Sequence, residues 1–159
     1  MMAKVKIGDI IEVKTNIGYF YAQYTHQDST HGALIQLTKN NFEKRPANLD
    51  DVANAEVGII TFFPLNIAVQ RQIFPVIGNA PISRNRQKFP VFRVRGDIDK
   101  ERNVKQWRFW DGQNAWPDFW IKELNDEQKN LPIRCIWNDT LLIERLESGY
   151  SPALDPVKI

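Results

Sequence analysis

The residues of this chain that could do chemistry are few and far apart. Two histidines, His26 and His31, lie five positions apart in the segment HQDSTH, and Asp28 lies between them. A zinc site needs three or four nitrogen, sulfur or oxygen ligands, and beyond Asp28 no residue is near enough in the sequence to complete one. We therefore expect a polar turn at this segment, with no metal and no cofactor.

A catalytic nucleophile is equally hard to find. Cys135 is the only cysteine, so no internal disulfide can form, which is typical of a protein from a reducing compartment. In the segment IRCIW this cysteine alternates with Ile133 and Trp137, which favours a place in the core. The sequence contains none of the common phosphate-binding, dinucleotide-binding, hydrolase or zinc-protease motifs. Carboxylate pairs such as Asp50 and Asp51 lie in polar, turn-like contexts. We therefore expect that the protein is not an enzyme.

An aromatic segment adjoins a basic one. Four of the five tryptophans fall within residues 107–120, and residues 84–108 carry nine basic and three acidic side chains, although the whole chain has a net charge of only +2. Arginine and aromatic residues are enriched at the centres of protein interfaces. The same residue types also bind single-stranded nucleic acids, by tracking phosphates and stacking on bases. Segment 84–120 therefore predicts either a protein-binding surface or, as the alternative, a nucleic-acid-binding one.

A hairpin should position these aromatic residues. The Asp111-Gly112 pair predicts a type I′ turn, with a strand over 104–110 before it and QNAW returning after it. Because side chains alternate between the two faces of a strand, Trp107 and Phe109 lie on one face, and Arg108 and Trp110 lie on the other. If only one face of the sheet is buried, we expect Trp107 and Phe109 inside, and Trp110 and Trp116 as cross-strand neighbours at least half exposed. A core role for the whole tryptophan cluster stays open. The candidate partner-binding residues are Arg93, Arg95, Arg108, Trp110 and Trp116.

Short apolar runs between glycines and prolines predict most of the remaining structure as strands. The C-terminal segment 140–148 is the strongest predicted helix, because Asn138 or Asp139 can cap it and Gly149 can end it. Its apolar stripe, Leu142, Ile143 and Leu146, should pack on the sheet with Ile7, Ile11, Ile35 and Trp137. Shorter helices are predicted at 49–56 and 125–131, with one helical turn within 65–72. Strands are predicted at 7–13, 18–26, 32–38, 58–63, 73–78, 90–95, 104–110 and 133–137.

These elements predict a single α+β domain over residues 1–159. We expect a bent antiparallel sheet or a partly open small β-barrel, with a few short helices and the C-terminal helix packed on it. Hydrophobic residues make up 43% and charged residues 25% of the chain, as in ordinary globular proteins. No apolar run approaches the roughly 20 residues that span a bilayer, and the N-terminus has no apolar stretch of signal-peptide length. We therefore expect a cytoplasmic protein without membrane association.

Three parts of the sequence resemble known bacterial proteins. They are KIGDIIEV with GYFYAQYTH and GALIQL, then TFFPL, then IRCIWNDTLLIERLESG. Over residues 4–80 the chain resembles the polymorphic-toxin immunity family twenty-six, whose members begin with a Gly-Asp strand and a glycine- and tyrosine-bearing hairpin strand. Here these are Gly8-Asp9 and residues 18–23, whereas residues 84–120 match no pattern of that family. The resemblance implies a small cytosolic α+β protein that binds and neutralises a cognate toxin without catalysis.

Overall fold

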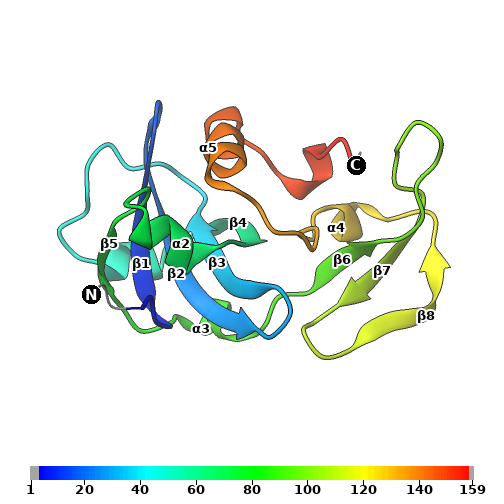
Figure 1. Ribbon diagram of the computed structural model, residues 1–159, viewed down its shortest axis with the longest axis horizontal. Helices are drawn as coiled ribbons and strands as arrows, with labels where there is room; N and C mark the ends of the chain where they lie inside the picture. Colours follow the sequence, from blue (N-terminus) through cyan, green and yellow to red (C-terminus); the bar gives the residue numbers. More distant parts are fainter. Residues whose placement is uncertain (1–3, 158–159) are drawn as a thin grey trace. The chain divides into compact units, whose positions relative to one another are not determined.

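The computed structural model describes residues 4–157, and the chain divides into two compact units. The first unit comprises Met1–Lys88 and Cys135–Gly149, and the second comprises Phe89–Arg134 and Tyr150–Ile159. Each unit contains one antiparallel sheet with short helices, so the protein is α+β and rich in strands (Figure 1). Over the described residues neither sheet closes into a barrel. The prediction of a single domain stays a prediction.

The first unit is built on a five-stranded sheet in the order β4-β3-β2-β1-β5. Every neighbouring pair is antiparallel, and consecutive strands β1, β2, β3 and β4 lie side by side. The first three predicted strands are therefore confirmed and pair in sequence order, and β3 has the predicted bounds. The strands are β1 (Asp9–Thr15), β2 (Gly18–Asp28), β3 (Gly32–Thr38), β4 (Val57–Phe62) and β5 (Val76–Asn79).

Both faces of the central strands are covered. Residues 20–25 of β2 and 34–38 of β3 are all buried, including Gln23 and Gln36. The amide of Gln23 donates to the Ala80 carbonyl at 2.9 Å, and that of Gln36 donates to the Thr25 hydroxyl at 3.0 Å. A buried amide is tolerated because such bonds replace those it made with water.

The C-terminal helix α5 (Asp139–Ser148) contacts β1, as predicted. The side chain of Asn138 caps it by accepting a hydrogen bond from the Leu141 amide at 2.8 Å, and Gly149 ends it in the left-handed conformation at φ +71°. The side chain of Glu147 accepts a hydrogen bond from the Asn16 amide at 2.6 Å. Three further helices belong to this unit: α1 (Asp50–Ala53), α2 (Leu65–Gln70) and α3 (Arg84–Gln87).

Most of the predicted core is buried, but Ile143 is only half-buried and Ile7 is exposed. Leu142, Leu146, Ile11, Ile35 and Trp137 are at most 5% exposed. The prediction for Ile7 was wrong: it precedes β1, and 46% of it is exposed. The predicted strand over 133–137 was also wrong, because this segment makes only isolated bridges, at residues 133 and 136.

Replacing Leu146 with alanine should cost about 2–5 kcal/mol of the free energy of unfolding, as for other buried leucines. Leu146 is 5% exposed, and its helix α5 contacts β1 of the same unit. Urea unfolding followed by circular dichroism measures the loss. Glu144→Ala, on the exposed side of the same helix, is the control and should change stability by no more than about 0.5 kcal/mol. A loss below half a kcal/mol for Leu146→Ala would mean that α5 is not docked.

The second unit is built on a three-stranded sheet in the order β6-β7-β8. Asp111 and Gly112 begin the turn that joins β7 to β8, so the predicted hairpin is confirmed. The predicted type I′ geometry was wrong, because only Gly112 has a positive φ there. The Asp111 carboxylate organises the turn by accepting hydrogen bonds from the amides of Gln113 and Asn114. The elements are β6 (Phe92–Arg95), β7 (Trp107–Trp110), β8 (Ala115–Ile121), α4 (Asp126–Lys129) and the 3-10 turn η1 (Pro152–Leu154).

Both faces of β7 are buried, which corrects the predicted exposure of Trp110. Trp107 and Phe109 are 5% exposed, as expected for one face. Trp110, on the other face, is only 9% exposed because Phe89, Phe92 and Arg134 pack against its ring. Trp110 pairs across the hairpin with Ala115, not with Trp116.

No helix within residues 4–157 combines the length and the apolar character needed to cross a membrane.

Candidate partner-binding surface

The strand β8 carries an unusual group of exposed aromatic side chains. Trp116 is 38% exposed, Phe119 is 68% exposed and Trp120 is 42% exposed. These three residues are called the β8 aromatic surface below. They lie on the edge strand of the second unit's sheet, because β7 covers only one side of β8. An edge strand with exposed aromatic rings tends to associate with another protein chain unless part of its own chain covers it.

A wide bulge in β8 determines where the rings of the β8 aromatic surface lie. Trp107 pairs with Ile121 and Phe109 pairs with Trp116, so four residues of β8 lie opposite the single residue Arg108. The extra residues bulge away from β7, and Phe119 lies within this bulge. Bulges of this kind bend a strand and re-aim its side chains.

The two tryptophans of the surface lie toward opposite faces of the sheet. The Trp116 ring packs against Phe109, with 6.3 Å between ring centroids, whereas Trp120 lies beneath the guanidinium of Arg108 at 5.7 Å. Phe109 and Arg108 are consecutive residues of a strand and therefore point to opposite faces. The β8 aromatic surface thus wraps around an edge and is not a flat patch.

Arg108 fixes the bulge. Its Nε donates to the Pro117 carbonyl at 2.6 Å, and its Nη2 reaches the Ala115 carbonyl at 3.4 Å. Trp120 is confined on another side by Gly96, where an added Cβ would lie 2.7 Å from the indole ring. The local structure therefore holds Trp120 in place through Arg108 and Gly96.

The predicted partner-binding residues fall into different environments. Trp116 belongs to the β8 aromatic surface, and Arg108 lies beside it. Arg95 is half-buried at the end of β6. Arg93 and Trp110 are buried, at 3% and 9% exposed. Sequence reasoning missed Phe119, which is the most exposed aromatic side chain of the surface.

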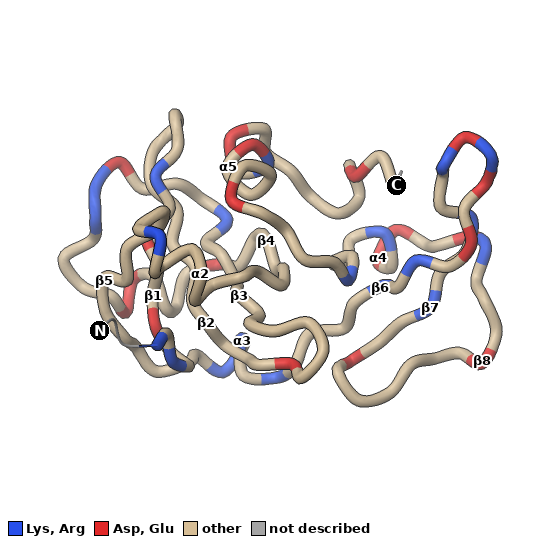
Figure 2. The backbone as a smooth tube through the Cα atoms, viewed as in Figure 1, with Lys and Arg blue, Asp and Glu red and all other residues tan. Residues whose placement is uncertain are grey.

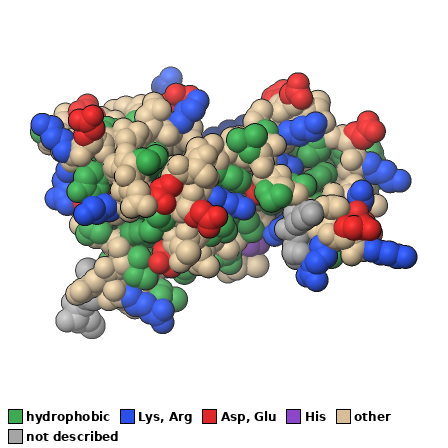
Figure 3. Space-filling view, turned by 90° about the horizontal axis from the view of Figure 1, so that it is seen from above, with side chains coloured by type: hydrophobic (Ala, Val, Ile, Leu, Met, Phe, Trp, Pro, Cys, Tyr) green, Lys and Arg blue, Asp and Glu red, His purple; other side chains and the backbone are tan. Residues whose placement is uncertain are grey.

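Several arginines of the basic segment point inward. Arg93 lies 4.4 Å above the Trp107 ring and donates to the carbonyls of Lys129, Leu131 and Pro152. Arg86 is fully buried in the first unit. Charge elsewhere in the segment is mixed: basic and acidic side chains alternate along the loop between β6 and β7 (Figure 2). The two signs are also interspersed over the face shown in Figure 3. The segment therefore offers less positive potential than its composition indicates.

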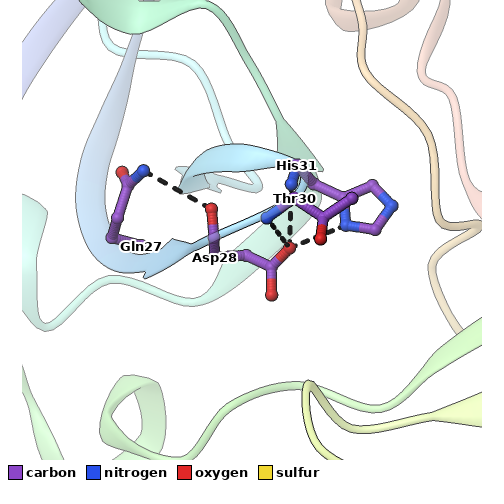
Figure 4. A network of polar contacts seen from close by, with 4 residues as sticks. All are labelled: Gln27, Asp28, Thr30 and His31. Atoms are coloured by element: carbon purple, nitrogen blue, oxygen red, sulfur yellow. Dashed lines mark hydrogen bonds and ion pairs between the residues drawn. The ribbon is translucent and has the colours of Figure 1, made fainter.

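The histidine segment forms the polar turn that the sequence predicts. The Asp28 carboxylate accepts hydrogen bonds from His31 Nδ1 at 2.7 Å and from the amides of Thr30 and His31 (Figure 4). Burial opposes ionisation of Asp28, but these hydrogen bonds outweigh it and lower the pKa of the carboxyl group. His26 Nε2 donates to the Gln87 carbonyl at 2.7 Å, and its Nδ1 contacts the Thr25 hydroxyl at 2.8 Å.

Within residues 4–157, no three histidine, cysteine, aspartate or glutamate side chains gather closely enough to hold a metal ion. Cys135 is half-buried, and the indole Nε1 of Trp137 donates to its sulfur at 3.0 Å. The expectations of no metal, no cofactor and no catalysis stay predictions.

A second charged cluster tethers the loop after β3 to the first unit's sheet. Arg45 donates to both oxygens of Glu12 at 2.8 and 3.0 Å, and the Tyr21 hydroxyl donates to the same carboxylate at 2.9 Å. The hydrogen bonds from Arg45 hold the pKa of Glu12 below its ordinary value of 4.5. Burial, together with the neighbouring carboxylate, raises the pKa of Tyr21.

This cluster predicts a pH dependence of stability. A carboxyl group whose pKa is lowered by folding adds stability above its unfolded pKa, and that stability is lost as the pH falls through the folded pKa. The melting temperature should therefore fall from about pH 5 downward, and Glu12→Gln should make this fall shallower. Thermal melts between pH 3 and pH 6 measure the slope, with Glu144→Gln on an exposed side of α5 as the control. Equal slopes for wild type and Glu12→Gln would contradict the prediction.

Comparisons of the sequence with protein-family models, with curated proteins and with solved structures find no match. The resemblance to the immunity family therefore stays a prediction.

Proposed function

We propose that this chain is a non-catalytic protein-binding domain, an immunity-type protein that binds and neutralises a cognate bacterial toxin. The observation that carries the binding role is the β8 aromatic surface, with three partly or largely exposed rings within five residues of an edge strand. The identity of the partner as a toxin rests on the resemblance of residues 4–80.

Aromatic side chains suit this role because each can bury a large area. A phenylalanine or tryptophan side chain removes roughly 150–250 Å² from water when fully buried. Phe119 is 68% exposed, so most of its area is available to a partner. A few such anchors commonly supply most of the affinity of an interface.

The surface is also held in place before binding. Arg108 bonds to two carbonyls of β8 and covers the Trp120 ring, while Phe109 supports Trp116. Side chains that are already ordered lose less conformational entropy when a partner binds. Because the rings lie toward both faces of the sheet, the partner must offer a cleft that straddles the edge of β8.

The proposal is tested by titrating the purified chain with the protein encoded by the gene next to its own. Phe119→Ala should weaken the complex more than tenfold, mostly through faster dissociation. Ile67→Ala is the matched control, because Ile67 is an exposed apolar residue (51%) of the first unit. It should leave affinity within twofold. Equal affinity for wild type and Phe119→Ala would contradict this role for the surface.

A nucleic-acid partner would give a different result. Single-stranded binding through phosphates loses affinity with salt at a slope near −0.7 per neutralised phosphate. We expect at most weak, salt-sensitive binding to a mixed-sequence oligonucleotide, on the order of 10⁻⁴–10⁻⁶ M. Tight oligonucleotide binding at physiological salt that Phe119→Ala abolishes would overturn the proposal in favour of a nucleic-acid-binding domain.

A further inference from the structure

The second unit contains a cavity that the β8 aromatic surface does not include. Its volume is about 490 Å³, which lies within the range of small-molecule sites. Its apolar walls are the Trp107 ring from β7, Leu124 from the segment after β8, and Pro152, Ala153 and Val157 from the C-terminal segment, and five charged side chains form the rest of the lining. A ligand in this cavity would therefore need an apolar body.

Two lysines line the same cavity. Lys122 and Lys129 are both exposed, and neither ammonium group has an ion-pair or hydrogen-bond partner among the described residues. Glu123 and Asp155 also line the cavity. The Asp155 carboxylate already accepts hydrogen bonds from the Tyr150 hydroxyl at 2.7 Å and from the Val157 amide at 2.8 Å. The positive groups thus have more unused hydrogen-bonding capacity than the negative ones.

A buried cation adds to this imbalance. Arg93 lines the cavity at 3% exposure, with its guanidinium 4.4 Å from the centre of the Trp107 ring. Among the described residues its hydrogen bonds go to three backbone carbonyls and none to a carboxylate, and Asp155 is an acidic group whose more distant charge acts on it. Inside a protein such a charge is poorly screened and acts over several ångströms. The wall beside Trp107 is therefore electropositive.

We propose that this cavity binds a small anionic ligand that joins a planar apolar body to one carboxylate or phosphate group. The apolar body packs against Trp107, Leu124 and Val157. The anionic group lies between the ammonium groups of Lys122 and Lys129. Glu123 disfavours a second anionic group on that side, which limits the ligand to one anionic group.

Calorimetric titration with simple probes tests the site. Phenyl phosphate and benzoate carry the two candidate anionic groups, and benzyl alcohol is the neutral analogue. At least one anion should bind with a dissociation constant below 1 mM (about −4 kcal/mol) and at least tenfold more tightly than benzyl alcohol. Inorganic phosphate alone should bind at least tenfold more weakly than phenyl phosphate if phosphate is the preferred group.

Matched variants locate the binding. The double variant Lys122→Gln, Lys129→Gln should weaken the preferred anion at least tenfold. Lys105→Gln should leave its affinity within twofold, because Lys105 is an exposed lysine outside the cavity that pairs with Asp99. Absence of binding by both anions, equal binding of benzyl alcohol, or equal losses in the two lysine variants would each overturn the proposal. Phe119→Ala leaves the cavity intact, so failure here is distinct from failure of partner binding.

Discussion

Replacing Arg86 with alanine is expected to lower the free energy of unfolding by about 3–5 kcal/mol, because buried hydrogen-bond acceptors lose their donor and the shorter side chain leaves a cavity. Arg86 is fully buried in the first unit. Its guanidinium donates to the Gln23 side chain at 3.0 Å and to the carbonyls of Val52 and Ala55 at 2.9 and 3.0 Å. Truncation leaves these three acceptors without the donor that replaced water.

The burial of Arg86 also has a cost. Its Nε is buried without a hydrogen-bond partner in the described part of the chain. Within residues 4–157 no carboxylate bonds to the guanidinium, and burial lowers the pKa of the group. Part of the loss on truncation is therefore offset by removing a desolvated charge. The net loss in the free energy of unfolding should therefore be smaller than the summed costs of three unsatisfied acceptors and a cavity.

Urea unfolding followed by circular dichroism measures the effect. Arg84→Ala, an exposed residue of the same short helix α3, should cost no more than about 0.5 kcal/mol. Arg86→Met keeps most of the volume but none of the donors, and its loss should lie between those of the two alanine variants. A stability gain in Arg86→Met would show that the buried charge outweighs its hydrogen bonds.

Replacing Trp110 with alanine is expected to cost about 3–5 kcal/mol, as for other large aromatic residues in cores. Its ring centroid lies 5.4 Å from that of Phe89 and 5.8 Å from that of Phe92, and the Arg134 guanidinium lies 4.9 Å from it on another side. The variant should therefore unfold the second unit at lower denaturant concentration and should not act as a selective binding mutant.

Tryptophan fluorescence suits this measurement, because four of the five tryptophans belong to the second unit. Phe119→Ala is the control: Phe119 is 68% exposed, and its loss should change stability by no more than about 0.5 kcal/mol. If Trp110→Ala were as stable as Phe119→Ala, the ring would not be part of the core.

Local patterns predicted the first unit well. Alternation, turn residues and caps located β1, β2, β3 and α5, because these features act over a few neighbouring residues. Asn138 is the clearest case, since its capping role needs only Leu141, three residues away. The α+β class with a C-terminal helix on the sheet is confirmed for the same reason.

Long-range contacts explain the misses. Trp110 is buried by Phe89 and Arg134, each more than 20 residues away, and no periodicity within 104–110 reveals that cover. Burial of Arg86 likewise depends on Gln23 and on the end of α1, so the composition of the basic segment does not reveal it. The exposure of Phe119 follows from the register shift opposite Arg108, which the sequence does not show.

Side-chain oxidation footprinting of the complex tests the central claim most directly. Hydroxyl radicals label exposed aromatic rings, so each ring of the β8 aromatic surface reports its own burial. With the adjacent gene product bound, we predict that labelling of Trp116, Phe119 and Trp120 falls at least threefold, while labelling of the half-buried Tyr19 and the exposed Ile67 in the first unit does not change. Binding that protects the first unit and leaves the three β8 rings as reactive as in the free protein would contradict the account.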